Sequence, residues 1–204
     1  MTALRITTAA VAPPRSPLTA ERVVATAVTI ADVEGLAALS MRRVAVGLGV
    51  ATMALYRHLP SKTERVHRMV DTVFGEQELP DPTPHGWRPR LELVARCWWR
   101  TVRRHPWVAG TGYLTRPALV PNGVAHADLA NRAVTRLYLD PVEASWTRAA
   151  LAGYVQGMAA YLQPPDEADA HGGNAHPDLD SRFEFGLALV LDGLAARRAA
   201  HRTR

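Results

Sequence analysis

Residues 52–58 carry side chains that together suit contact with a nucleic-acid groove. Thr52 can donate or accept a hydrogen bond, and Met53 and Ala54 can contact the methyl group of a thymine. A helix that presents these groups outward fits the major groove of B-form DNA, where its N-terminal residues meet the base edges. We therefore expect an interface with double-stranded DNA at Thr52, Met53, Ala54, Tyr56, Arg57 and His58.

The residues before this segment give it a second helix to pack on. A helix is predicted over residues 41–48, and only residues 49–51 separate it from the next helix, predicted over 52–58. A tight, glycine-containing turn between two short helices is typical of a helix-turn-helix. In that arrangement Leu55 and Leu59 face inward, and the polar side chains of the segment face outward.

Longer helices are predicted on both sides of this unit. One spans about residues 19–33 and ends at Gly35, since glycine readily takes the left-handed conformation that closes a helix. The other spans about 61–75 and opens with a capping box. In that motif the Ser61 hydroxyl accepts from the backbone amide of Glu64, and the Glu64 side chain reaches back to the amide of Ser61.

The sequence assigns a definite role to some positions in this region and leaves alternatives for others. Lys62 begins a helix, where its amine and the helix N-terminus can both hold a phosphate. Arg57 can reach either a base or a phosphate, whereas Arg43 is expected to be a solvated or intramolecular charge. Ala51 cannot cap the recognition helix through its side chain, at a cost of about 1 kcal/mol, unless Thr52 takes over that role.

These residues resemble the DNA-binding domain of the TetR (tetracycline repressor) family. The resemblance covers residues 19–75 and is carried by the pattern SMRxxAxxLGVxxMALYRHLxxK, from Ser40 to Lys62. The helix that contains Phe183 and Leu194 is also similar to the last helix of that family. The middle of the chain matches only in its pattern of helices.

The resemblance implies roles for several side chains. It places Ser40 and Arg42 at the DNA, with Arg42 reaching into the groove or its edge, and it makes Tyr56 and His58 phosphate ligands. It also implies an all-α protein that releases DNA when a small molecule binds.

Composition is compatible with this interpretation without requiring it. The chain has 204 residues, a formal net charge of +5 and a pI near 10.0, and Lys62 is its single lysine. Arginine suits bidentate contacts to phosphate and guanine, although an arginine-rich composition can equally reflect genome base composition. Cys97 is the single cysteine, so no intrachain disulfide can form, as fits the cytoplasm. No apolar run is long enough for a membrane span.

Prolines and glycines divide the chain into expected parts. Residues 1–17 lack the apolar run of a signal peptide and are expected to be a disordered arm, followed by the DNA-binding domain over 18–76. A proline-rich linker is expected over 77–89, and a larger regulatory and dimerisation domain over 90–204. Within that domain we expect helices over about 90–105, 122–138, 141–162 and 180–198, with a flexible loop over 163–179.

The helices at 141–162 and 180–198 are apolar enough to bury more than one face. Two such helices from each of two chains would form a four-helix core of a homodimer, although both can also pack entirely within one chain. The small residues Gly153, Gly157, Gly186 and Gly193 permit close helix approach. A dimer would hold two recognition helices about 34 Å apart, so that each reads half of a near-palindromic operator.

An aromatic set in the larger domain can line a cavity for a small-molecule effector or form ordinary core. The family resemblance favours the cavity. Cys97 is interpreted as a buried inert thiol, with a redox switch as the alternative. The candidate effector-binding residues are Trp98, Trp99, Trp107, Tyr113, Trp146, Tyr154 and Met158.

Catalytic and metal signatures are missing from the sequence. It has no G-x-S-x-G, P-loop, dinucleotide or HExxH motif, and His171 and His176 in the 163–179 loop are too irregularly spaced to predict a metal site. We expect no catalytic residue, metal or cofactor. The sequence therefore predicts a ligand-responsive repressor. A DNA-binding protein without a ligand, and a small helical carrier or enzyme, are the alternatives.

Overall fold

The computed structural model describes residues 17–137, 140–162 and 178–202, and within these ranges the molecule is built from helices alone. This confirms the all-α class. The expected 1–17 arm, apart from Pro17, and the 163–179 loop with His171 and His176, apart from its last two residues, lie outside the described residues. The helices are α1 (Ala20–Glu34), η1 (Leu36–Ala38), α2 (Met41–Leu48), α3 (Thr52–Tyr56), α4 (Lys62–Gly75), α5 (Trp87–Arg104), η2 (Pro106–Thr111), η3 (Pro117–Leu119), α6 (Pro121–Thr135), α7 (Pro141–Ala159), η4 (Ala160–Leu162) and α8 (Leu179–Arg202).

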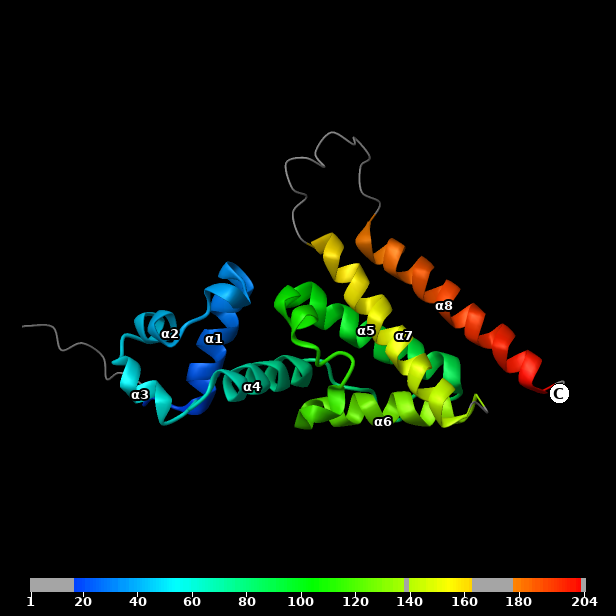
Figure 1. The fold of residues 1–204 in the computed structure, drawn as a ribbon, viewed down its shortest axis with the longest axis horizontal. Helices are drawn as coiled ribbons and strands as arrows, with labels where there is room; N and C mark the ends of the chain where they lie inside the picture. Colours follow the sequence, from blue (N-terminus) through cyan, green and yellow to red (C-terminus); the bar gives the residue numbers. More distant parts are fainter. Residues whose placement is uncertain (1–16, 138–139, 163–177, 203–204) are drawn as a thin grey trace, which may run out of the picture.

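The helices form an elongated arrangement. Figure 1 shows α1, α2 and α3 gathered at one end, with α4 leading from them toward α5 and α6, and α7 and α8 side by side at the other end. None of the helices in the described ranges combines the length and apolar character needed to cross a membrane.

Side-chain caps fix where several helices begin. Thr19, Ser40 and Ser61 each accept a hydrogen bond from the backbone amide three residues on, at 3.3, 3.1 and 3.0 Å. The second half of the predicted capping box is wrong, because the Glu64 carboxylate accepts from Arg68 Nε at 2.7 Å instead of reaching back. A charged donor one turn along the helix offers that carboxylate a stronger partner than a neutral amide does.

Some predicted boundaries differ from those observed. α5 begins at Trp87, so the last three residues of the expected 77–89 linker are helical, and Pro89 falls in the first turn, where an amide needs no partner within the helix. α3 ends at Tyr56 rather than His58, and α6 ends at Thr135. α8 begins at Leu179, where the Asp178 carboxylate accepts from the backbone of the first turn.

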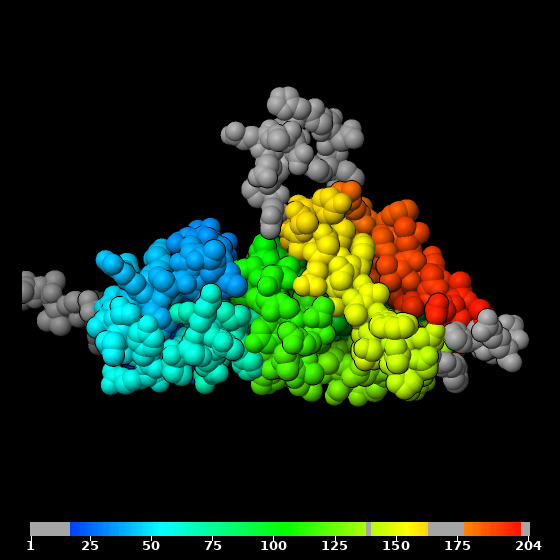
Figure 2. Space-filling model, in the orientation of Figure 1, coloured from blue at the N-terminus to red at the C-terminus, as the bar shows by residue number. Residues whose placement is uncertain are grey.

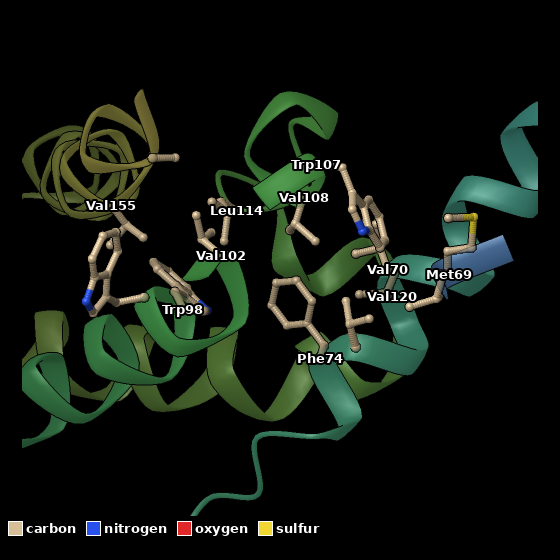
Figure 3. Close-up of a cluster of buried hydrophobic side chains, with 14 of the residues drawn as sticks. Met69, Val70, Phe74, Trp98, Val102, Trp107, Val108, Leu114, Val120 and Val155 are labelled. Carbon is tan, nitrogen blue, oxygen red and sulfur yellow. The ribbon is translucent and has the colours of Figure 1, made fainter. Parts of the chain in front are cut away.

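One buried hydrophobic cluster runs through both the N-terminal and the C-terminal helices. Figure 3 shows Val70 and Phe74 of α4 beside Trp107, Val108 and Val120, all of which are buried. Figure 2 shows the surface of the N-terminal helices lying directly against that of α5 and α6. The division at 77–89 therefore separates stretches of chain whose apolar side chains share a core.

A buried histidine joins these two parts with polar contacts. His105, which directly follows α5, is 3% exposed. Its Nδ1 lies 2.7 Å from Asp32 Oδ1 on α1, and its Nε2 lies 3.1 Å from Glu76 Oε2 at the end of α4. The same Asp32 oxygen accepts from Trp107 Nε1 at 2.7 Å. Three separate elements thus meet at one imidazole ring.

The chemistry of this node explains why a histidine stands there. A carboxylate oxygen only accepts hydrogen bonds, so both contacts of His105 form together when each ring nitrogen carries a hydrogen. No apolar side chain could make either contact. Removing the imidazole takes one donor from each carboxylate, while Trp107 still donates to Asp32 and Arg104 still contacts Glu76.

Replacing His105 with Leu should lower the free energy of unfolding by about 2 kcal/mol, because Asp32 and Glu76, at the edge of the core, each lose a hydrogen-bond donor. The measurement is the urea unfolding curve followed by circular dichroism. Arg104→Ala is the control, since Arg104 also contacts Glu76, at 3.2 Å, but is 69% exposed and should change stability by less than about 1 kcal/mol. Equal effects of the two variants would show that the node has no special role.

Candidate nucleic-acid interface and ligand cavity

The turn between α2 and α3 depends on Gly49. This residue has φ +65° and ψ 37°, a left-handed conformation that favours glycine. Its amide donates to the Val46 carbonyl at 3.2 Å, and the Val50 amide donates to the Ala45 carbonyl at 3.1 Å. These bonds satisfy the last carbonyls of α2 and turn the chain sharply into α3.

α3 has one buried face and one open face, as the sequence predicts. Leu55 and Leu59 are 0% and 1% exposed, whereas Met53 and Tyr56 are 75% and 45% exposed. Arg57 is exposed as well. Thr52, Ala54 and His58 are partly buried at the margins of the open face. The outer face of α3 is therefore available to a partner along its whole length.

The surroundings of α3 are positively charged. The sequence from Gly35 to Thr63 contains no Asp or Glu. Arg42, Arg57 and Lys62 are exposed, and none of them pairs with a carboxylate among the described residues. A surface with unpaired cations and no nearby acid attracts a polyanion.

Arg43 behaves differently from its neighbour Arg42. Its guanidinium lies in two-pronged contact with Glu34, with Nε at 2.9 Å and Nη2 at 2.6 Å from Oε1, and these bonds raise the pKa of Arg43. Of the two alternatives predicted for Arg43, a solvated or an intramolecular charge, the structure shows the intramolecular one.

The hydroxyl groups of Thr52 and Ser40, at the starts of α3 and α2, differ in whether they are hydrogen-bonded within the chain. Ala51 occupies the N-cap position and makes no side-chain bond there. Thr52 does not replace it, because its hydroxyl bonds to none of the described residues. Ser40, in contrast, uses its hydroxyl to cap α2. The Thr52 hydroxyl is thus free for an external partner, and the Ser40 hydroxyl already has an internal one.

The seven aromatic and methionine side chains expected to line one cavity do not lie together. Trp99 stacks on Phe183, with ring centroids 4.9 Å apart, and donates from Nε1 to Asp180 at 2.7 Å. Tyr154 also stacks on Phe183, and its hydroxyl donates to the Phe183 carbonyl at 2.7 Å. These contacts dock α8 against α5 and α7. Trp99 and Tyr154 therefore form ordinary core.

The other members of that set are scattered too. Trp146 is 66% exposed on α7, Met158 is buried, and Tyr113 lies edge-on to the ring of His67. Trp107 borders a hollow of about 550 Å³ between α1, η1, η2 and α7. The seven side chains are thus spread over different surroundings, because residues spaced along several helices face different neighbours once the helices are packed.

Trp98 borders a separate cavity of about 350 Å³. The cavity lies between α5, α6, α7 and segment 114–119, which includes η3. Sequence reasoning missed its polar members, Thr115, Arg116, Asn131 and Arg148, since no motif marks them and only tertiary packing brings them together. The lining residues are Trp98, Leu114, Thr115, Arg116, Pro117, Ala118, Leu119, Ala127, Ala130, Asn131 and Arg148.

The wall of this cavity is bonded directly to α4. His67 Nε2 donates to the Leu119 carbonyl at 2.7 Å. The backbone amide of Asn122 donates to Asp71 Oδ1 at 2.7 Å, and its side-chain Nδ2 donates to the backbone carbonyl of Asp71 at 3.0 Å. Close packing continues at Gly123, where a Cβ atom would stand 2.1 Å from the Pro117 carbonyl oxygen. Segment 114–122 thus connects the cavity to α4.

The far end of the molecule exposes an apolar surface. α7 carries Val142 and Trp146 four residues apart, and α8 carries Phe185 and Leu189 four residues apart, each more than half exposed. A Cβ atom on Gly153, Gly157 or Gly193 would meet nothing within 4 Å, whereas Gly186 lies against Tyr154 of the same chain. Both helices therefore pack one face within the chain and leave a second one open.

The Cys97 thiol and the potential metal ligands show no sign of a reactive or metal-binding site in the described residues. Cys97 is fully buried, and burial raises the pKa of its thiol despite nearby Arg100, which favours the inert interpretation. No three His, Cys, Asp or Glu side chains of the described ranges gather as metal ligands would.

Known proteins resemble the chain along most of its length. It is 34% identical over 222 residues to the HTH-type transcriptional repressor DrrR1 of Streptomyces coeruleorubidus, in a match that covers 93% of this chain and 82% of the relative. The TetR family protein ActR of Streptomyces coelicolor, solved in complex with actinorhodin, has a TM-score of 0.70 and 28% identity and covers 90% of this chain and 99% of its own. Mycobacterium smegmatis BioQ has a TM-score of 0.71, 26% identity, and coverage of 88% and 99%. No family model matches the chain.

Ala51→Ser should raise the free energy of unfolding by about 0.5 to 1 kcal/mol, because the new hydroxyl can accept from a free amide in the first turn of α3. Urea unfolding measures the change. Ala125→Ser, at an exposed position inside α6, is the control and should lower stability slightly, since serine is a weaker helix former than alanine. A decrease for Ala51→Ser would mean that the backbone at residue 51 does not act as a helix N-cap.

Proposed function

Because the chain belongs to the TetR family of helix-turn-helix transcriptional regulators, we propose that it represses transcription from a near-palindromic operator and leaves that operator when a small molecule binds. The observation that carries the proposal is the open face of α3, which is exposed, flanked by unpaired cations and free of acidic residues. DrrR1 is named a repressor, and ActR binds actinorhodin in its crystal structure.

We assign base contacts to the first residues of α3. Thr52 has an unengaged hydroxyl, and Met53 and Ala54 offer apolar contact to thymine methyl groups. Arg42 on α2 supplies a guanidinium at the edge of the groove. These side chains can distinguish one base pair from another, because they meet base edges rather than the backbone.

Phosphate contacts are assigned to the residues around the end of α3. Tyr56, Arg57 and His58 lie on or beside the open face, and Lys62 stands in the first turn of α4. The amine of Lys62 and the free amides of that turn can hold the same phosphate. Ser40 acts indirectly in this scheme, since its hydroxyl caps α2.

We propose a homodimer through α7 and α8. The open apolar face of these helices supports the proposal, because exposed side chains such as Trp146, Phe185 and Leu189 gain free energy when a second copy covers them. A four-helix interface of this kind places two copies of α3 on one side of a DNA duplex. In this organisation residues 18–76 form the DNA-binding part and residues 90–204 the regulatory and dimerisation part, joined across 77–89.

The cavity beside Trp98 is the proposed effector site. A ligand there contacts segment 114–119, and this segment is tied to α4 through His67 and Asp71. Movement of the segment is passed to α4, which carries Lys62 and supports α3. Occupancy changes DNA affinity if the bound cavity favours a dimer with wrongly spaced recognition helices.

The proposal includes a cytoplasmic location, where operator DNA is found. A regulator without a ligand is the nearest alternative, and the connection between the cavity and α4 favours a ligand-responsive protein over it. A carrier or enzyme function has no comparable support, since it leaves the open, cationic face of α3 unexplained.

Selection of bound sequences from a random DNA pool tests the function directly. We expect an enriched site with two related half-sites in inverted orientation, because each protomer reads one half. Recovery of no common sequence at any salt concentration would contradict the proposal and indicate non-specific binding.

Variants then separate the two kinds of contact. Lys62→Ala should weaken binding to every sequence and lower the slope of log K against log salt by about 1, because one phosphate contact is lost. Tyr56→Ala should also weaken binding to every DNA sequence. Thr52→Ala should instead relax preference at particular base pairs while leaving the salt slope unchanged. A change of sequence preference for Lys62→Ala would overturn the assignment of its role.

Leu189→Glu should convert the dimer to a monomer at micromolar concentration, since a carboxylate at this apolar surface loses hydration when a second copy packs on it. Analytical ultracentrifugation gives the mass. Val33→Glu, on α1 and 79% exposed in the wild-type protein, is the matched control and should leave the mass unchanged. A dimer that survives Leu189→Glu would place the interface elsewhere.

A further inference from the structure

The cavity beside Trp98 has apolar walls and cationic polar groups. Leu114, Pro117 and Ala130 supply apolar surface, and none of the lining residues is acidic. Arg116 and Arg148 come from different elements, the segment before η3 and helix α7, and border the same space. Two guanidiniums without a carboxylate create a positive potential in a partly apolar site.

The arginines of the cavity differ from others in the same half of the chain. Arg88 bonds to Asp192, and Arg96 bonds to Glu184 through two nitrogens, at 2.7 and 2.8 Å. Neither Arg116 nor Arg148 pairs with a carboxylate among the described residues. Their charges are therefore available to an anion from solution.

Trp98 provides an independent observation. It is 2% exposed, and its Nε1 is buried with no hydrogen-bond acceptor in the described part of the chain. The two other buried tryptophans of this region, Trp99 and Trp107, both donate from Nε1 to an aspartate, at 2.7 Å. Buried donors rarely lack a partner, and Trp98 borders the cavity, so its Nε1 is a candidate donor to a ligand oxygen.

We propose that this cavity binds a planar aromatic carboxylate. Arg116 and Arg148 hold the carboxylate as bidentate donors, the ring system lies against Leu114, Pro117 and Ala130, and Trp98 Nε1 donates to an oxygen of the ligand. A volume of about 350 Å³ is at the small end for ligand sites and suits a compound of two or three fused rings. The effector role of such a ligand rests on the proposed function, whereas its chemical class rests on the cavity.

Calorimetric titration of the full-length protein with 2-naphthoate and with 2-naphthamide tests the class of ligand. The two probes share shape and differ in charge. We expect 2-naphthoate to bind about tenfold more tightly, and Arg116→Gln or Arg148→Gln to remove most of that preference. Arg132→Gln is the matched control, because Arg132 is exposed on α6 outside the cavity, and it should retain the preference. Equal affinity for both probes, or no binding of either, overturns the inference.

The Trp98 part is tested by the indole N–H resonances of the 15N-labelled protein. The Trp98 signal, assigned by its loss in Trp98→Phe, should move when 2-naphthoate is added to the wild-type protein, and an unmoved signal would remove Trp98 from the site. Binding of the selected operator without any probe is measured on the same preparation. Retained operator binding without a charge preference refutes the ligand class alone, while a charge preference without operator binding refutes the proposed repressor and supports the cavity assignment.

Discussion

Three parts of the molecule meet at the imidazole ring of His105, which joins them through directional polar contacts. Asp32 belongs to α1, Glu76 follows α4, and His105 itself ends α5, so a single buried side chain bonds the N-terminal helices to the C-terminal ones. Hydrophobic packing between Phe74 and its neighbours supplies contact area there but little direction. Hydrogen bonds are directional, so the contacts of His105 restrict how α1 and the end of α4 can lie against α5.

A second set of bonds meets α4 nearer its middle. His67 and Asp71 hold segment 114–122, which forms one wall of the cavity beside Trp98. α4 is thus fixed at its end by the His105 node and along its length by the wall of the cavity. A rigid helix held at two points turns about one of them when the other moves. In the proposed function, a ligand that displaces the wall would act on the recognition helix through these contacts of α4.

The N-terminal helices were largely predictable because their signals are local. Ser40 and Ser61 cap the helices that follow them, Gly49 takes the left-handed turn, and α2 has the predicted bounds. Such signals involve residues only a few positions apart, and the same physical preferences act in any protein. The wrong prediction at Glu64 has a local cause. Two donors lie within reach of its carboxylate, the backbone amide of Ser61 and the guanidinium of Arg68, and the carboxylate bonds to the charged one. The early start of α5 at Trp87 shows likewise that a proline in a first turn does not mark a linker.

The cavity could not be predicted from local sequence patterns. The sequence around an aromatic residue in an apolar helix does not indicate whether its side chain lines a ligand cavity or packs in the core. Trp98 and Trp99 are adjacent in sequence, but Trp98 borders the cavity and Trp99 stacks on Phe183. Arg116 and Arg148 are distant in the chain, and the sequence offered no reason to connect them. The sequence by itself therefore determined the helical class, the helix-turn-helix and the open face of α3, because these follow from helix periodicity and capping. Tertiary structure alone decided the His105 node, the cavity and its route to α4, because each needs side chains from elements that only packing brings within hydrogen-bond distance.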